Sequence, residues 1–537
     1  MDGSPHPSAE RCYYSAVATF YVQNFGCRAT QADGAALERQ FEERGLERAA
    51  DASRAEIVVL NTCTVTASAD QDARAAIRRV YRENPGARIV VTGCYAQRAP
   101  EELAALPGVA QVVGNSHKHQ LVELVLPMTI TPSPQRDPVS GSNNFVALDS
   151  LMLGRRPTTD DRRPIHVSDI FAHTELLAAP VFDAANQRTR PNLKVQDGYD
   201  NRCSFCVIPF VRGQNRSLPL GRILGEVETL VLAGFREVVI SGINLGRWGR
   251  DLDGSDQLSA VSSQLSEASD SLAFDEDANI HRSGRRPTTD DRRPLFEDLV
   301  RAILERTSLE KLRISSVEPM DWSDELISIV AGSPRIAKHA HVPMQSGSDA
   351  VLRRMHRKYR PWHYREKIEK IRAAMPDAAI GADVMVGFPG ETDAEFEETR
   401  RTVDELPFTY LHVFTYSARP GTPAAAMAKQ VPVRVARDRN RILRELAAEK
   451  KQRFMESFVG RRVQAITLGH DNTEEDFTEA LTDHYLSLQL PARMEPNRWV
   501  SAHVTRAQEG KLFGEVEPAP IAASSTPSLT SELAFAP

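Results

Sequence analysis

Short runs of β-branched residues alternate with stretches of helical periodicity along the first part of the chain. The runs that we expect to form strands are Ala16–Val22, Glu56–Leu60, Arg88–Thr92 and Val109–Val113, with helical patterns between them. Strands that alternate with helices indicate an open parallel sheet with helices packed against it. The pattern therefore predicts an α/β domain over residues 16–125.

The same alternation returns between Leu193 and Tyr416, where six strands are expected. They are Leu193–Val195, Glu237–Ser241, Leu312–Val317, His339–Val342, Ile380–Val386 and Tyr410–Tyr416. Six such units predict a partial (βα)6 barrel over residues 191–425, and a barrel of this kind carries its chemistry at the carboxyl ends of its strands. The predicted fold class is α/β.

Five further segments differ in composition from these two domains. The chain from Arg434 to Arg462 is rich in Arg and Lys at helical spacing, and we assign a basic helix to residues 426–456. Residues 457–517 have the pattern of a small all-β module. The connector 126–190, the insertion 251–294 within the barrel and the tail 518–537 are polar or Pro/Ser-rich, and we expect disorder there.

The connector and the insertion share one undecapeptide, Gly-Arg-Arg-Pro-Thr-Thr-Asp-Asp-Arg-Arg-Pro, at residues 154–164 and 284–294. One short copy with divergent flanks is not a solenoid repeat, so we assign it no chemistry.

Composition narrows the classes of protein. The chain has 537 residues, 41% of them hydrophobic, which is enough for two to four domains. Its net charge of −6 argues against non-specific coating of nucleic acid, although a local basic face can still bind a folded RNA. No apolar run approaches the length of a membrane span, and the first residues lack a signal-peptide centre. We expect a soluble, cytoplasmic protein with no membrane partner.

Six cysteines are too few for a disulfide framework in so long a chain. Cys27, Cys63 and Cys94 each follow a predicted strand of the first domain, whereas Cys12 looks incidental. Because loops at the carboxyl ends of parallel strands converge, these three cysteines could meet and bind metal. The alternative is three buried apolar thiols.

Cys203 and Cys206 lie in a loop directly after the first barrel strand, with Tyr199 four residues before Cys203. A cysteine in place of Tyr199 would complete the spacing that lets three thiolates hold three irons of a [4Fe–4S] cluster and leaves the fourth iron open.

The chain resembles the radical S-adenosylmethionine methylthiotransferases over nearly its whole length, apart from the insertions and termini. The resemblance rests on the three N-terminal cysteines and on Lys194–Gly198, Asp200–Cys206, Ser241–Gly246, His341–Ser348 and Gly387–Thr392. The C-terminal module resembles the TRAM domain, an RNA-binding β-barrel. Gly387–Thr392 lacks the Gly-Lys-Ser/Thr ending of a phosphate loop, and we interpret it as a turn.

The resemblance implies two [4Fe–4S] clusters and S-adenosyl-L-methionine. The barrel cluster, on Cys203 and Cys206, would reduce S-adenosylmethionine to a 5′-deoxyadenosyl radical that abstracts hydrogen from the target carbon. The auxiliary cluster, on Cys27, Cys63 and Cys94, would present the sulfur. The implied cofactor-binding residues lie at barrel strand ends, and each could equally be a satisfied polar group: Ser241, Gly242, Asn244, Gln345, Ser346 and Asp383. Beyond the clusters we assign no catalytic residue.

Relatives modify isopentenyl- or threonylcarbamoyl-adenosine beside the tRNA anticodon, or a ribosomal protein. Phe25–Asp33 is closest to the threonylcarbamoyladenosine branch, although Thr30 replaces its usual asparagine. The resemblance thus implies methylthiolation of N6-threonylcarbamoyladenosine at position 37 of tRNA, with the anticodon stem-loop, a reductant protein and a sulfur source as partners. The cations and aromatic rings of Arg353–Tyr364 suit RNA contact, although such a run is usually a solvated face.

Tyr199 sets this sequence apart, because a phenol is a harder and weaker ligand for iron–sulfur clusters than a thiolate. Three interpretations stay open: a variant with impaired activity, a non-catalytic RNA-binding paralogue, or a cluster with unusual ligation. We favour the first.

Overall fold

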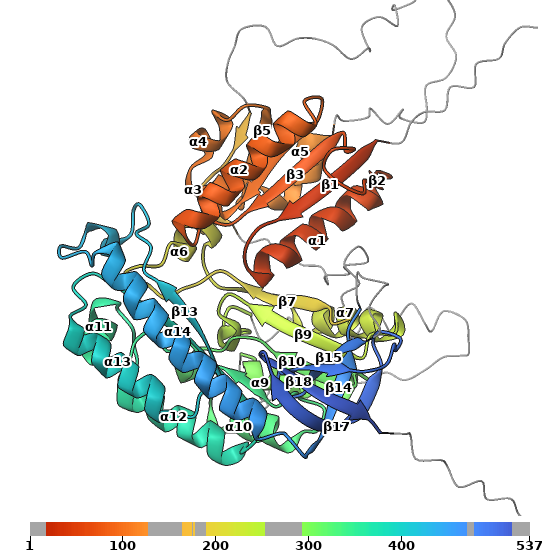
Figure 1. The fold of residues 1–537 in the computed structure, drawn as a ribbon. Coiled ribbons are helices and arrows are strands. Elements are labelled where there is room, and N and C mark those ends of the chain that lie inside the picture. The colour runs from red at the N-terminus through yellow and green to blue at the C-terminus, as the bar shows by residue number, and fades with distance from the viewer. Residues whose placement is uncertain are drawn as a thin grey trace, which may run out of the picture.

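A computed structural model describes residues 18–126, 164–173, 176–177, 189–252, 293–469 and 477–517. The N-terminal domain lies above the barrel in Figure 1, and a long helix connects the barrel to a small β-barrel. Cys12, the tail and most of the connector and insertion lie outside the described residues, and so does nearly all of each undecapeptide copy. The expected disorder of these segments therefore stays a prediction. In the described part of the chain, no helix is long and apolar enough to cross a membrane.

The N-terminal domain is a six-stranded parallel sheet in the order β2-β1-β3-β4-β5-β6. Its strands are β1 (Thr19–Asn24), β2 (Glu47–Arg48), β3 (Ile57–Thr62), β4 (Arg88–Gly93), β5 (Val109–Gly114) and β6 (Ile165–His166). Its helices are α1 (Arg28–Glu43), α2 (Ala67–Glu83), α3 (Cys94–Arg98), α4 (Pro100–Ala104) and α5 (Leu121–Val125).

Burial on both faces explains the unbroken apolar runs of this sheet. Val58 packs with Ile77 of α2 on one face, and Val59 packs with Leu37 of α1 on the other. A central strand with helices on both sides needs apolar side chains at consecutive positions, which is why the sequence shows runs instead of alternation.

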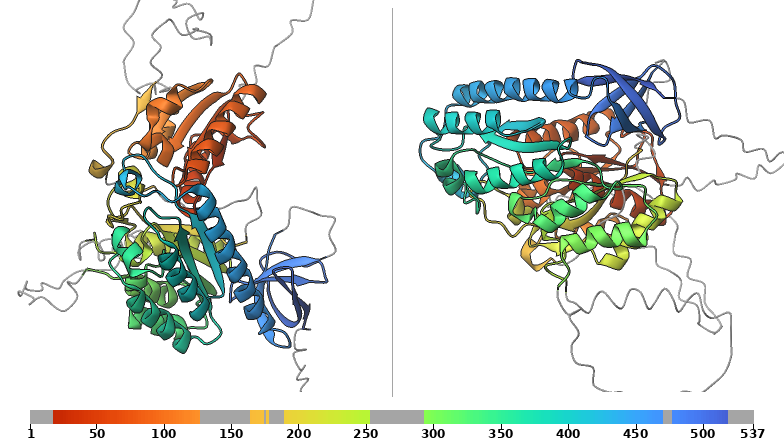
Figure 2. Two further views of the ribbon diagram at one scale, coloured as in Figure 1. Left: turned by 60° about the vertical axis from the view of Figure 1, so that its left-hand side comes forward. Right: turned by 90° about the horizontal axis from the view of Figure 1, so that it is seen from below.

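The second domain is an open barrel of six parallel strands with an antiparallel edge strand, β8 (Arg216–Ser217). The six are β7 (Asn192–Asp197), β9 (Glu237–Gly242), β10 (Lys311–Ile314), β11 (His339–His341), β12 (Ala379–Val386) and β13 (Tyr410–Thr415). Two isolated bridges, Leu312 to Ile336 and Ser316 to His341, join the β10 and β11 halves into one arc. The outer helices, seen in Figure 2, are α7 (Leu220–Leu232), α9 (Phe296–Arg306), α10 (Asp324–Gly332), α12 (Pro361–Ala374) and α13 (Asp393–Glu405).

Helix α14 (Val433–Glu456) runs along the barrel to a closed five-stranded barrel in the order β14-β15-β16-β18-β17. The strands are β14 (Arg462–Thr467), β15 (Thr478–Thr482), β16 (Ser487–Leu490), β17 (Trp499–Gln508) and β18 (Lys511–Val516). Met455 and Phe458, at the end of α14, are part of its core. Lys311 Nζ of β10 lies 2.8 Å from Asp483 Oδ2 and fixes the small barrel against the large one.

All six predicted barrel strands and the all-β C-terminal module are confirmed. Two kinds of element differ from expectation. The two-residue strands β2, β6 and β8 were not predicted, because so short a strand leaves no period-2 pattern. The basic helix assigned to residues 426–456 ends at Glu456 as expected but begins only at Val433.

A buried network of charges joins the N-terminal domain to the barrel. Asp33 of α1 accepts from Lys118 Nζ at 3.0 Å, from Arg212 Nη2 at 3.0 Å and from Lys194 Nζ. Asp197 accepts from Lys194 at 2.8 Å and from Arg212 at 2.9 Å. Three cations thus enclose two carboxylates, and none of the five side chains exceeds 8% exposure. Charges this deeply buried are tolerated only when paired, so the network fixes one relative placement of the two domains.

Candidate functional site

The three N-terminal cysteines converge at the carboxyl edge of the first sheet. Thr62 pairs with Gly93 across β3 and β4, so Cys63 and Cys94 leave the sheet side by side. Gly26, at a φ of 95°, lies so close that an added Cβ would be 2.8 Å from Cys63 Sγ. The loop that carries Cys27 therefore lies directly against Cys63. Cys27 is exposed, whereas Cys63 and Cys94 are buried.

Electrostatics agree with this proximity. Burial, and then the neighbouring Cys94 and Cys27, raise the pKa of Cys63 to about 12. The positive charge of the Arg212 guanidinium opposes that rise in pKa. Arg212 also interacts electrostatically with Cys94 and Cys27. A metal ion or cluster would relieve the repulsion between crowded thiolates, because its own charge stabilises them. Three converging thiols, one of them open to solvent, fit a three-thiolate cluster.

The barrel cysteine loop follows β7 and is tightly constrained. Tyr199 N donates to Gly213 O at 3.0 Å, and Cys206 N donates to Cys203 O at 3.1 Å. At Gly198, with a φ of 77°, an added Cβ would lie 1.6 Å from Gln214 O, so only glycine fits there. The backbone is that of a ligand loop even though its first ligand position holds a phenol.

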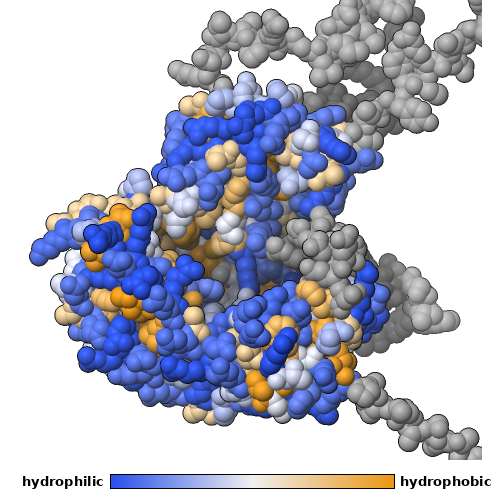
Figure 3. Space-filling view, in the orientation of Figure 1, coloured by the Kyte–Doolittle hydropathy of each residue, from blue (hydrophilic) through white to orange (hydrophobic). Residues whose placement is uncertain are grey.

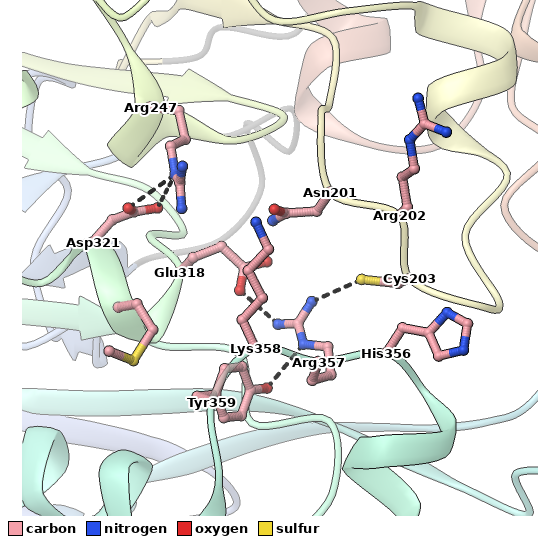
Figure 4. A pocket seen from close by; sticks show the side chains of 11 residues that line it. Asn201, Arg202, Cys203, Arg247, Glu318, Asp321, His356, Arg357, Lys358 and Tyr359 are labelled. Atoms are coloured by element: carbon pink, nitrogen blue, oxygen red, sulfur yellow. Dashed lines mark hydrogen bonds and ion pairs between the residues drawn. The ribbon is translucent and has the colours of Figure 1, made fainter.

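Tyr199 is integrated into a hydrogen-bonded network. Its hydroxyl donates to Glu318 Oε1 at 3.3 Å and lies 3.7 Å from Cys203 Sγ. Arg357 Nη1 is 3.4 Å from both the phenol oxygen and Cys203 Sγ, and Nη2 donates to Glu318 Oε2 at 2.5 Å. Figure 4 shows the Arg357 side chain aimed at Cys203, Glu318 and Tyr359 at once.

These contacts do not fit three-thiolate ligation. Burial, and then the charges of Glu318 and Cys203, raise the pKa of Tyr199 well above its usual value, so the phenol stays protonated at neutral pH. Burial and the neighbouring Cys203 likewise raise the pKa of Cys206 to about 12. The site offers two thiols and one neutral phenol where a [4Fe–4S] cluster with an open iron requires three thiolates.

A cavity of about 210 Å³ adjoins this loop and is lined by Cys203, Cys206, Asn244, Gln345 and Asp383, among others. Asn244 Oδ1 and Gln345 Oε1 are buried there without a hydrogen-bond partner among the described residues. Gln345 also holds a φ of 65°, fixed by its N–H donating to Asp383 O at 2.8 Å. Buried acceptors without partners and a strained backbone are typical of ligand sites.

The other residues expected to bind cofactor take different positions. Ser241 and Gly242 line a second, larger cavity, and the buried Ser241 hydroxyl has no hydrogen-bond partner in the described part of the chain. Ser346 faces α13, with its hydroxyl 3.0 Å from Thr399 Oγ1 and accepting from Ser348 N at 3.1 Å. Ser346 therefore stabilises the loop after β11 by these hydrogen bonds. The carboxylate of Asp383 lies 3.4 Å from His341 Nε2.

The larger cavity, of about 390 Å³, extends from Cys27 to the strand ends of the barrel. Ile208, Ile243 and Ser316 line both cavities, so the two adjoin each other. Figure 3 shows a hollow between the N-terminal domain and the barrel. The cleft formed by the two cavities thus has Cys27, the exposed member of the N-terminal thiols, at one end and the barrel cysteine loop at the other.

Several residues of this cleft were not predicted from the sequence. They are Arg28, His339, His341, Tyr410, His412 and Tyr485. One ligand atom from each of His341, Asp383 and His412 lies within 4.8 Å of the others, which is compact enough for a metal ion. The His-Ala-His sequence of β11 is the one signal that could have shown inward-facing imidazoles.

Arg353–Tyr364 has a structural role more than an RNA-facing one. Arg353 pairs with Asp349 at 2.8 Å, and Arg354 pairs with Glu395 at 2.8 Å. Tyr359 and Tyr364 are buried, although Trp362 is 56% exposed. Most of its cations are therefore neutralised within the fold.

Comparison with known proteins gives a consistent result. Residues 19–114 match a family described as uncharacterized protein family UPF0004, and residues 194–403 match the radical SAM superfamily. The chain is 32% identical to the threonylcarbamoyladenosine tRNA methylthiotransferase MtaB of Rickettsia prowazekii, over 87% of this chain and 92% of that protein. The MtaB of Bacillus subtilis is also 32% identical, over 88% and 90%.

One further relative and one solved structure carry other names. The tRNA-2-methylthio-N(6)-dimethylallyladenosine synthase of Thermobifida fusca is 31% identical over 93% of this chain and 89% of that protein. Among solved structures, the radical S-adenosylmethionine methyltransferase TsrM of Kitasatospora setae aligns with a TM-score of 0.46 and 14% identity, covering 76% of this chain and 75% of that one.

Proposed function

Since the chain belongs to the radical S-adenosylmethionine tRNA methylthiotransferases, we propose that it is built to add a methylthio group to threonylcarbamoyladenosine beside the tRNA anticodon. The convergence of Cys27, Cys63 and Cys94 on a cleft whose other end is the barrel cysteine loop carries the proposal. The relatives named for that nucleoside support the choice of substrate, and this chain covers at least nine-tenths of the length of each of the two compared above.

Radical chemistry at an unreactive C–H carbon comes from a bound [4Fe–4S] cluster and S-adenosylmethionine, and the protein supplies binding and orientation. Cys27, Cys63 and Cys94 would hold the auxiliary cluster, with the Arg212 guanidinium stabilising their thiolate forms. Ser241, Asn244 and Gln345 would bind the polar end of S-adenosylmethionine, because each keeps a buried oxygen free for a ligand. Gly242 has no room for a side chain, since an added Cβ would lie 2.7 Å from Gln196 Oε1.

Because Tyr199 replaces a cluster ligand, we expect the barrel cluster of this chain to assemble poorly. The neutral phenol, joined to Glu318 and Arg357, supports the interpretation of an enzyme with impaired radical initiation. The non-catalytic paralogue is disfavoured by the surviving auxiliary thiols and by the open acceptors of the cofactor cavity.

Dimethylallyladenosine is the second candidate substrate, because a relative named for it is 31% identical over 93% of this chain. Thr30, which departs from the asparagine of the threonylcarbamoyladenosine branch, lies with its hydroxyl 3.5 Å from Cys27 Sγ and 3.4 Å from Arg212 Nη2. Thr30 can thus support the N-terminal thiols as a polar residue in the first turn of α1. The tRNA would also contact the C-terminal barrel, and a reductant protein and a sulfur source complete the expected partners.

The test is iron and sulfide per chain after anaerobic reconstitution, together with low-temperature EPR with and without S-adenosylmethionine. Four irons per cluster give about eight irons if both clusters assemble and about four if only the auxiliary cluster does. We expect about four, with a signal that S-adenosylmethionine leaves unchanged. Iron-free protein after reconstitution would contradict the proposed function.

A further inference from the structure

One arginine in the larger cavity stands without an acidic partner. Arg28 is the first residue of α1, directly after Cys27, and it lines the 390 Å³ cavity. Among the described residues, no carboxylate pairs with its guanidinium. Arg28 is only partly buried, and two fully buried arginines differ from it: Arg212 pairs with Asp33 and Asp197 at 3.0 and 2.9 Å, and Arg357 pairs with Glu318 at 2.5 Å.

The surroundings of Arg28 favour an anion. No Asp or Glu among the described residues lines this cavity, and Asp383, which lines the adjoining one, lies 3.4 Å from His341 Nε2. Helix α1 is 16 residues long, has no acidic side chain in its first turn and no side-chain cap at Cys27. The positive end of the helix dipole and its free N–H groups therefore add to the charge of Arg28.

Strands β9, β11 and β13 of the barrel contribute uncharged hydrogen-bonding groups to the lining of this cavity. Burial lowers the pKa of His339 well below its usual value, and His339 Nε2 lies 2.6 Å from the Tyr410 hydroxyl. Ser241 Oγ, proposed above to bind S-adenosylmethionine, is buried in this wall without a hydrogen-bond partner among the described residues, and His341 Nε2 lies 3.4 Å from Asp383 Oδ1. Buried polar atoms of this kind need a ligand to complete their bonding.

Size and aromatic walls point to a nucleoside. A volume of about 390 Å³ lies in the ordinary range of small-molecule sites. Tyr410 and Tyr485, with ring centroids 5.7 Å apart, line the cavity and give it an aromatic surface against which a base can pack.

We propose that Arg28 and the N-terminus of α1 bind the carboxylate of the threonylcarbamoyl substituent, so that this cavity selects the modified adenosine by the charge on its N6 group. The inference rests on the proposed function and adds the residue that sets its specificity. A dimethylallyl group has no carboxylate, so it would cover Arg28 and leave the guanidinium desolvated and unpaired. A site built around a polar partner rejects the analogue that lacks it more strongly than an apolar pocket rejects extra polarity.

Binding of three anticodon stem-loop RNAs tests this selectivity without requiring turnover. The RNAs differ only in the nucleoside beside the anticodon: threonylcarbamoyladenosine, dimethylallyladenosine or adenosine. Fluorescence anisotropy is measured with the anaerobically reconstituted full chain and with Arg28→Gln, Arg28→Lys and Arg39→Gln. Arg39 is a matched control, because it lies on the same helix and pairs with Glu43 at 3.1 Å on an exposed face. Equal iron content and equal melting temperature establish that the variants are comparable.

The parent should bind the threonylcarbamoyl stem-loop about tenfold or more tightly than the adenosine one, as expected for a hydrogen bond to a charged group. Arg28→Gln should abolish that preference and leave the affinity for the adenosine stem-loop unchanged. Arg28→Lys should keep part of the preference, and Arg39→Gln all of it.

The contrary outcomes separate the two claims. Equal affinity of the parent for all three RNAs, or a preference that survives Arg28→Gln, overturns the carboxylate site and leaves methylthiolation standing. Tighter binding of the dimethylallyl RNA overturns the carboxylate site and moves the proposed function to the second substrate. Failure of the parent to bind any stem-loop overturns both.

Discussion

The two cysteine sites are built in the same way but differ in the number of thiols that they hold. In each, ligand residues leave the carboxyl ends of parallel strands into a shared cleft, and a buried arginine stands beside them: Arg212 at the N-terminal site and Arg357 in the barrel. The N-terminal site keeps three thiols. The barrel site keeps two, and Arg357 bonds a phenol in the place of the third. A ligand can therefore change while its loop persists, because Gly198 and backbone hydrogen bonds, not the ligand side chain, define the loop.

Restoring the third thiol should produce the largest effect, because it removes the difference between the sites. Tyr199→Cys should raise the iron content from about four to about eight per chain and start 5′-deoxyadenosine formation. The measurement is iron analysis with chromatographic detection of 5′-deoxyadenosine. Tyr199→Phe is the control, since it removes the hydroxyl without adding a ligand. No gain in iron or product with Tyr199→Cys would show that the phenol is not what prevents assembly.

Deleting one thiol at each site should separate them by iron content. Cys63→Ala should lose the auxiliary cluster, about four irons per chain, because two thiolates cannot hold three irons. Cys206→Ala should leave that iron in place. Iron analysis and the EPR spectrum of the reduced protein report both. Unchanged iron in Cys63→Ala would remove the N-terminal cysteines from consideration as ligands.

The two buried arginines should differ in what they contribute to stability. Arg212→Gln leaves Asp33 and Asp197 undercompensated, so the free energy of unfolding should fall by about 3–5 kcal/mol. Arg357→Gln should cost less, about 1–3 kcal/mol, because the Glu318 side chain is 19% exposed and water can reach it. Denaturant unfolding of both variants gives the comparison. A larger loss for Arg357→Gln would mean that the barrel network, more than the domain junction, stabilises the fold.

The smallest effect concerns Tyr199 at high pH. Burial raises the pKa of this phenol above its value in the unfolded chain, so its contribution to stability is complete below about pH 10. That contribution is lost as the pH rises towards the folded-state pKa, because the folded chain holds the proton more tightly. Tyr199→Phe should therefore lose less stability than the parent above about pH 10. Parallel curves for the two proteins, from unfolding at a series of pH values, would contradict a buried protonated phenol.

The sequence predicted the main strands and the cysteines that follow them, but it did not predict several of the residues that line the cleft. Runs such as Ile57–Thr62 are buried on both faces, so composition alone located the strands and the cysteines that follow them. Arg28, His341 and His412 lie on three elements that only the folded chain brings together, and no spacing in the sequence relates them. Arg353–Tyr364 looked suited to RNA because its acidic partners, such as Glu395, lie elsewhere in the sequence.

The charged junction also limits how this architecture can be recombined. Asp33 lies six residues after Cys27, and Arg212 lies six residues after Cys206, so each ligand loop is joined in sequence to one half of the same junction. A chimera that replaces the N-terminal domain of this chain would lose Asp33 and Lys118 and keep Lys194, Asp197 and Arg212, whose charges would then lack their partners across the junction. Transplanting either cysteine loop in active form should therefore require moving the junction with it, so the two domains act as one unit of exchange.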